Sequence, residues 1–157
     1  MKKNFIWNLV PPGTKARREL IWIIIGLTLS AALSLWFVFG YRTSYMALLY
    51  ARTAGERAGR EFTYTMPKFA RLLGGSLSGF VIMIAAMALL GLAHRSSFYS
   101  GSMSIYLMKR LPDKRTLLKC TWGMPAFGTA LSVLTGLTIL LIYLAVYYLA
   151  TPAAWLP

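Results

Sequence analysis

The stretch LIWIIIGLTLSAALSLWFVFGY, residues 20–41, decides the fold class because it contains no Asp, Glu, Lys or Arg. A helix crosses the hydrocarbon core of a bilayer with about 20 apolar residues, so this stretch is long enough for one span. Basic residues precede it, as they precede a secretory signal. However, its apolar run exceeds the ~7–15 residues of a signal core, and no A-x-A-like cleavage site follows it. We therefore expect a retained membrane anchor.

Two further stretches, 72–94 and 120–157, also lack charged side chains. The first of them suits one span. The second is longer, but Pro125 and Pro152 bound its apolar part and leave one helix at about 126–150. Two spans would need about 40 residues plus a turn. The sequence thus predicts three transmembrane helices and an all-α, polytopic membrane protein.

The composition points to the same class of protein. Apolar residues make up 57% of the chain and charged residues 13%, whereas roughly a quarter of a soluble domain is charged. A water-soluble core is therefore excluded, and residues 1–157 are expected to form a single membrane domain. The net charge is +13, and the basic residues flank apolar spans, where they meet anionic headgroups directly. Anionic lipids are the expected partners of these charges, and nucleic acid is not.

The basic residues also predict which side of the membrane each loop faces. The N-terminal arm, 1–19, holds five of them and the second loop, 95–125, holds six. The first loop, 42–71, holds six and the tail, 151–157, holds none. The positive-inside rule therefore places the arm and the second loop in the cytoplasm. We expect a multi-pass protein of the cell membrane with a cytoplasmic N-terminus and an extracellular first loop, tail and C-terminus.

Short segments between the spans are expected to lie at the membrane surface. The apolar residues before Pro11 and Pro12 are too few to span, so they are predicted to form an elbow in the inner interface. The first loop alternates apolar and charged groups as far as Pro67, which favours either a helical extension of the first span or an interfacial helix. Its arginines are either solvated or meet acidic headgroups or an anionic peptide, and both interpretations stay open at this point.

All three spans carry small residues at a spacing of about four. Such stripes let helix backbones approach closely, so they favour packing against one another or against another subunit. The predicted helix-packing residues are Gly26, Ser30, Ser34, Gly75, Gly79, Gly128, Ser132 and Gly136.

The residue types that catalysis requires are scarce. The chain has four carboxylates, one histidine and one cysteine, and it has no GxxxxGK[ST] motif. No acid–base pair, metal cluster or ATP-binding loop is therefore expected. The spans hold no ionisable residue away from their ends, which argues against an ion-coupled transporter. His94, beside Arg95 at the predicted inner boundary, is interpreted as an interface residue. We expect no enzyme activity and no cofactor.

The second loop contains SMSIYLMKRLPDKR, residues 102–115, whose first part is apolar around much of its circumference. Met103 to Leu111 is predicted to form a short helix, Pro112 ends it, and Asp113 opens a second amphipathic turn. A helix surrounded by water would not carry so many apolar side chains. It is therefore expected to lie either in the membrane interface or in a groove on a partner.

This loop resembles the first cytoplasmic loop of type-2 ATP-binding-cassette (ABC) exporter permeases. There, a glycine, a short apolar helix, a Leu-Pro pair and basic residues separate two spans. The matching positions in this chain are Gly101, Leu107, Leu111, Pro112, Arg115 and Lys119. The chain is also similar to small Firmicutes membrane proteins associated with such transporters. In the family this loop is the coupling helix, which docks in a cleft of the ATPase subunit and carries its motion to the spans.

The resemblance implies an ATPase-docking segment at 103–115. Its residues are Met103, Ile105, Tyr106, Leu107, Met108, Lys109, Arg110, Leu111, Pro112 and Arg115. Such permeases have six spans, so a three-span chain would be half a permease or an accessory subunit beside another permease subunit or a second copy. The leading hypothesis is a non-catalytic membrane subunit of an ATP-driven exporter. The alternative is a structural or regulatory membrane adaptor that associates through its small-residue helix faces.

Overall fold

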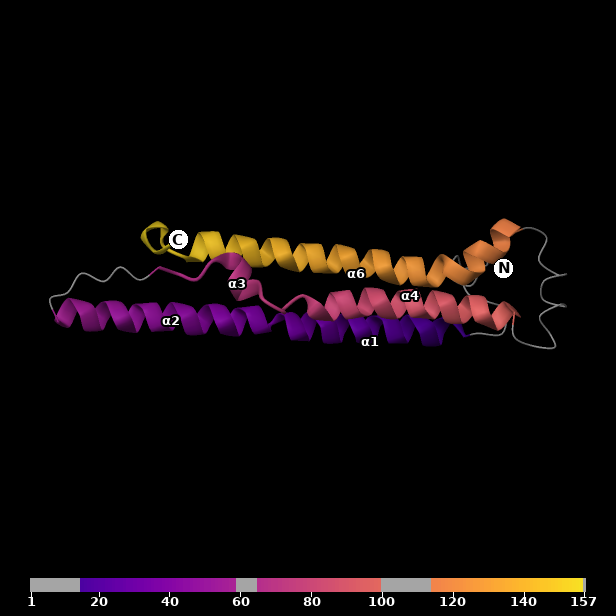
Figure 1. Ribbon diagram of the computed structural model, residues 1–157, viewed down its shortest axis with the longest axis horizontal. Helices are drawn as coiled ribbons and strands as arrows, with labels where there is room; N and C mark the ends of the chain where they lie inside the picture. The colour runs from indigo at the N-terminus through magenta and orange to yellow at the C-terminus, as the bar shows by residue number, and fades with distance from the viewer. Residues whose placement is uncertain (1–14, 59–64, 100–113, 157) are drawn as a thin grey trace. The chain divides into compact units, whose positions relative to one another are not determined.

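A computed structural model describes residues 15–58, 65–99 and 114–156, with side chains except at 97–99 and 114–117. All regular structure in these ranges is helical (Figure 1). The elements are α1 (Ala16–Ser34), α2 (Trp36–Arg57), α3 (Phe69–Leu73), α4 (Ser78–Tyr99), α6 (Lys114–Ala150) and the short 3-10 helix η2 (Ala153–Trp155).

Three helical segments are long and apolar enough to cross a membrane. They are Ala16–Arg57, Ser78–Ser96 and Leu118–Ala150. The predicted all-α class with three candidate transmembrane helices is therefore confirmed. These segments are compatible with a multi-pass membrane protein, while the side on which each loop lies stays a prediction.

The helix boundaries differ from the expected spans in two informative places. Helix α6, which contains the third expected span, begins at Lys114 and passes through Pro125, whereas the sequence suggested a start near residue 126. A proline inside a transmembrane helix is tolerated where other groups satisfy the freed backbone carbonyl. Helix α4, which contains the second expected span, begins at Ser78, after a turn at Gly74. The φ angle of Gly74 is +40°, a backbone conformation that residues with a side chain rarely adopt.

The loops add two further observations. Helical structure continues beyond the first expected span as α2, which ends at Arg57. A helix in this part of the first loop agrees with both alternatives that the alternation favoured, an extension of the span and an interfacial helix. The predicted elbow before Pro11 and the predicted helix at 103–111 lie outside the described residues.

The chain divides into two compact units, which are described separately. Unit 1 comprises residues 1–29 and 80–135, and unit 2 comprises residues 30–79 and 136–157. Each unit therefore combines segments from the first, second and third long helical regions.

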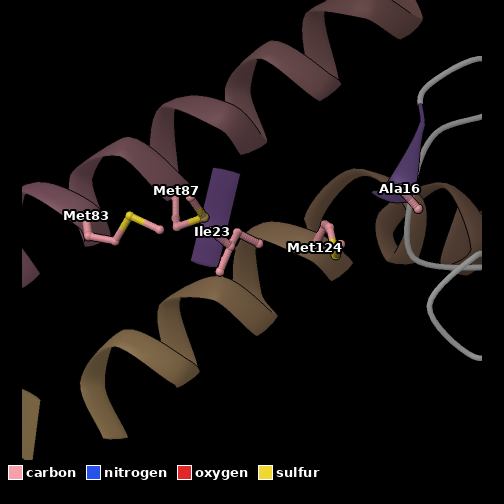
Figure 2. Packing of buried hydrophobic residues seen from close by; sticks show 5 residues of the cluster. All are labelled: Ala16, Ile23, Met83, Met87 and Met124. Carbon is pink, nitrogen blue, oxygen red and sulfur yellow. The ribbon is translucent and has the colours of Figure 1, made fainter. Parts of the chain in front are cut away.

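Unit 1 has a core built mainly from methionines. Ile23 of α1, Met83 and Met87 of α4, and Met124 of α6 are buried there together with Ala16 (Figure 2). The unbranched thioether side chain fills irregular gaps between helices because it bends at several torsions. The methionine side chains thus fill the space between the three helices at this cluster.

Unit 2 has an aromatic core in which polar tips are satisfied. Phe37 of α2 stacks on Tyr143 of α6 with ring centroids 4.4 Å apart. The Tyr143 hydroxyl lies 3.0 Å from Ser34 Oγ. The Tyr147 hydroxyl donates to the carbonyl of Pro67 at 3.0 Å. Buried tyrosines of this kind contribute a large apolar area to the core. Burial of their hydroxyl groups is tolerated because each hydroxyl has a hydrogen-bond partner.

Two glycines that the sequence places in one stripe have different environments in unit 2. A Cβ atom added to Gly79 would lie 2.9 Å from Ser30 Cα, whereas one added to Gly75 would meet no atom within 4 Å. Backbone atoms at that distance must move, and overpacking costs about 1–3 kcal/mol. We therefore expect Gly79→Ala to lower the free energy of unfolding by that amount. Thermal unfolding in detergent, followed by circular dichroism, measures the loss.

Gly75→Ala is the matched control, since it makes the same chemical change where space is open. It should leave the melting temperature within about 1–2 °C of the original value, because substitutions away from packed features change stability by no more than ~0.5 kcal/mol. Equal losses for the two variants would contradict the close approach at Gly79.

Candidate functional site

A buried histidine joins the three long helices of unit 1. His94, near the end of α4, is only 5% exposed. Its Nε2 atom lies 3.0 Å from Oε1 of Glu19, in the first turn of α1. Its Nδ1 atom lies 3.3 Å from the carbonyl oxygen of Thr121 in α6. One imidazole ring thus contacts a carboxylate on one helix and a backbone carbonyl on another.

Pro125, four residues after Thr121, bears on the hydrogen bonding of the Thr121 carbonyl. In a regular helix the carbonyl of residue 121 accepts a hydrogen bond from the N–H of residue 125. Pro125 has no N–H, so it cannot donate to Thr121. The imidazole N–H of His94 donates to that carbonyl instead. This contact compensates in part for the proline and allows α6 to continue through it.

The contact with the carbonyl defines one hydrogen of the imidazole ring. A carbonyl oxygen can only accept, so Nδ1 of His94 carries a hydrogen. Nε2, on the other side of the ring, lies 3.0 Å from Oε1 of Glu19.

The surroundings of the pair are closed to solvent. The side chain of His94 is 7% exposed and that of Glu19 is 11% exposed. The second carboxylate oxygen of Glu19, Oε2, is buried and has no hydrogen-bond partner among the described residues. Breaking the pair would therefore leave a carboxylate poorly solvated, so the contact is strongly favoured over separation.

One turn before His94, a second contact joins α4 to α6. A Cβ atom on Gly91 would lie 2.7 Å from Cζ3 of Trp122, so the indole ring lies against bare backbone. Only glycine permits this approach. The two contacts together fix the end of α4 against the first turns of α6, which are the two ends of the second loop.

We call the His94–Glu19–Thr121 site the clamp, because its hydrogen bonds join three helices. Among the described residues no group of three His, Cys, Asp or Glu side chains is placed to hold a metal ion. The site lies inside packed helices, and its groups already use one another as hydrogen-bond partners. Its geometry is therefore suited to holding three helices together.

The structure places only part of the predicted site residues. Of the predicted ATPase-docking set, residues 103–112 lie outside the described residues, and Arg115 lies in the first turn of α6. That segment is connected directly to the clamp, since it follows α4 and precedes the Thr121 turn.

The predicted helix-packing residues fall into two groups. Six of them are buried or packed within their own unit. Gly26 faces Met83, Gly128 faces Met87 and Ile23, and Gly79 faces Ser30. Ser30, Ser132 and Ser34 are buried, and Ser34 contacts Tyr143. Gly75 is exposed and Gly136 is half-buried.

Sequence reasoning missed the clamp. It interpreted His94 as a residue of the membrane interface and did not predict that its side chain is buried between helices. A partial signal was present in the sequence: Glu19 is the only carboxylate at the start of the first span, and His94 is the only histidine, at the end of the second span. Pro125, four residues after Thr121, marked a change in the backbone hydrogen bonding of the third helix. Only the packing shows that all three meet.

Comparisons with protein-family models, with curated proteins and with solved structures find no match to this chain. The fold itself defines an all-helical protein with three helices able to span a membrane.

Loss of the imidazole should destabilise unit 1 strongly. We expect His94→Leu to lower the free energy of unfolding by about 3–5 kcal/mol, because it strands the buried Glu19 carboxylate and removes the donor to Thr121. The double variant Glu19→Leu/His94→Leu should recover part of that loss, since the lone buried charge is gone. Reversible unfolding in mixed micelles measures all three proteins.

Arg95→Leu serves as the control for this measurement, because Arg95 is the exposed neighbour of His94. Its effect should stay within about 0.5 kcal/mol. A His94→Leu protein as stable as the original would show that the clamp does not hold the helices.

Proposed function

We propose that the chain is a non-catalytic membrane subunit of an ABC-type exporter and that its second loop docks the ATPase subunit. The observation that carries the proposal is the clamp at the two ends of this loop. His94 lies just before the loop and Thr121 just after it, and the two are in contact although 27 positions separate them. The loop resembles the coupling helix of type-2 exporter permeases, so the clamp would hold the ends of a segment that transmits motion from the ATPase.

A loop that transmits motion needs ends that move with the membrane helices. If the ends were loosely attached, displacement of the docked segment would be lost in the flexing of its connections. Here the ends are held by a buried pair and by the Gly91–Trp122 contact, and Glu19 extends the connection to α1. A push on the loop is therefore expected to move three helices as one body.

The side chains of the docking segment suggest how it would bind the ATPase. Apolar side chains anchor it in a groove of the ATPase, with Tyr106, Leu107, Met108 and Leu111 as the buried contacts. Lys109, Arg110 and Arg115 orient the segment against an acidic rim. Such docking requires a cytoplasmic loop, which agrees with the orientation that the positive-inside rule predicts, in the cell membrane. A second permease subunit or a second copy completes the transporter.

The alternative, an adaptor that binds other spans through its small-residue faces, receives less support from the geometry. Gly26, Gly79 and Gly128 already face side chains or backbone of their own chain. These positions are therefore used for internal packing. Gly75, which is exposed, remains as a place where another span could approach closely.

The direct test is a charge in the middle of the docking segment. We expect Leu107→Asp to abolish co-purification of an ABC-type ATPase with the tagged full-length chain from native membranes in mild detergent. A carboxylate buried in an apolar groove without a partner costs several kcal/mol, which corresponds to a loss of association of two or more orders of magnitude. Quantitative mass spectrometry of the eluted proteins measures the loss.

Tyr50→Asp is the matched control, because Tyr50 is a 71% exposed apolar residue on α2, in the first loop. It should leave ATPase recovery unchanged, and both variants should insert into the membrane at the original level. Full ATPase recovery with Leu107→Asp would overturn the docking assignment. Recovery of no ATPase with the unmodified chain would favour the adaptor.

A further inference from the structure

Unit 2 contains an open groove that its own packing does not fill. It lies along α2 and the segment that leads into α3, and its volume is about 630 Å³. Pockets for small molecules typically measure ~300–1,000 Å³, so the groove is large enough for part of an amphiphile. Its lining includes Trp36, Phe39, Gly40, Thr43, Arg71 and Leu72.

The lining combines exposed apolar walls with a single cation. The Trp36 side chain is 74% exposed and that of Phe39 is 65% exposed. Leu72 of α3 adds apolar surface beside the exposed Arg71. Within the described ranges, Arg71 has no carboxylate at ion-pair distance. The groove thus combines an apolar path with one guanidinium that forms no ion pair with a described carboxylate.

Gly40 keeps the groove open. A Cβ atom added to Gly40 would meet no protein atom within 4 Å, in contrast to the tight environments of Gly26, Gly79 and Gly128. Those three glycines let helices approach each other. At position 40 the absence of a side chain leaves empty space on the surface of α2 instead.

We propose that this groove binds an anionic phospholipid, with an acyl chain along Trp36, Phe39 and Leu72 and the phosphate on Arg71. The charge is complementary, since a guanidinium pairs with phosphate through two parallel N–H···O bonds. The apolar walls are complementary to a hydrocarbon chain and would be unfavourable in contact with water. Lipid is also the ligand with which this surface of a membrane-spanning segment is in permanent contact. The site is independent of the proposed ATPase partner.

The test measures lipid retention by the full-length chain. The protein is reconstituted into nanodiscs of equal parts phosphatidylcholine and phosphatidylglycerol, released into mild detergent and analysed by native mass spectrometry. We expect the unmodified chain to retain phosphatidylglycerol in preference to phosphatidylcholine. Arg71→Gln should reduce this preference about fivefold, the factor that one membrane-surface cation contributes.

Two companion variants make the result specific. Gly40→Leu should reduce retention of both lipids, because its side chain occupies the groove. It should still fold, since the space is open and leucine favours helix over glycine. Arg42→Gln removes an exposed cation of α2 that does not line the groove, and it should leave the preference unchanged.

Three outcomes would overturn the proposal. An unchanged lipid preference in Arg71→Gln would show that the guanidinium does not bind the phosphate. Equal losses in Arg71→Gln and Arg42→Gln would show diffuse attraction by a basic surface. Undiminished retention in a folded Gly40→Leu protein would show that the groove holds no acyl chain.

Discussion

The contact of His94 with Glu19 and with the Thr121 carbonyl is the interaction on which the arrangement of unit 1 depends. It pairs two titratable groups that would each be costly to bury alone, and it supplies a donor near the proline that interrupts the bonding of α6. Because the partners come from α1, α4 and α6, one imidazole ring restricts all three helices. The methionine core supplies further contacts between the same three helices.

The two units solve the problem of packing apolar helices in different ways. Unit 1 uses flexible methionines and bare glycine backbone, while unit 2 uses stacked rings whose hydroxyls bond to Ser34 and to Pro67. In a bilayer the hydrophobic effect does not drive one apolar helix against another, so close packing and hydrogen bonds must do so. Both cores meet that requirement. The polar contacts also fix which residues of neighbouring helices lie opposite one another, which packing alone would not define.

The fold class was predictable because a charge-free stretch such as residues 20–41 has few alternatives to a membrane helix. The helix start at Lys114 was not, since a proline normally marks a boundary and only tertiary contacts allow the helix to pass it. Gly75 and Gly79 are equivalent in the sequence, yet only Gly79 meets a neighbouring backbone. The clamp could not be predicted from the sequence for the same reason. Its members are far apart in the chain, and packing determines whether residues of three helices meet.

We propose that the second loop docks in an ATPase subunit and does not lie on lipid. To distinguish the two, a photo-crosslinking phenylalanine analogue is placed at Met108 of the full-length chain and native membranes are irradiated. Docking predicts a crosslinked product that contains an ABC-type ATPase, and none when the same analogue replaces Tyr50. Crosslinks from position 108 to lipid alone would contradict it.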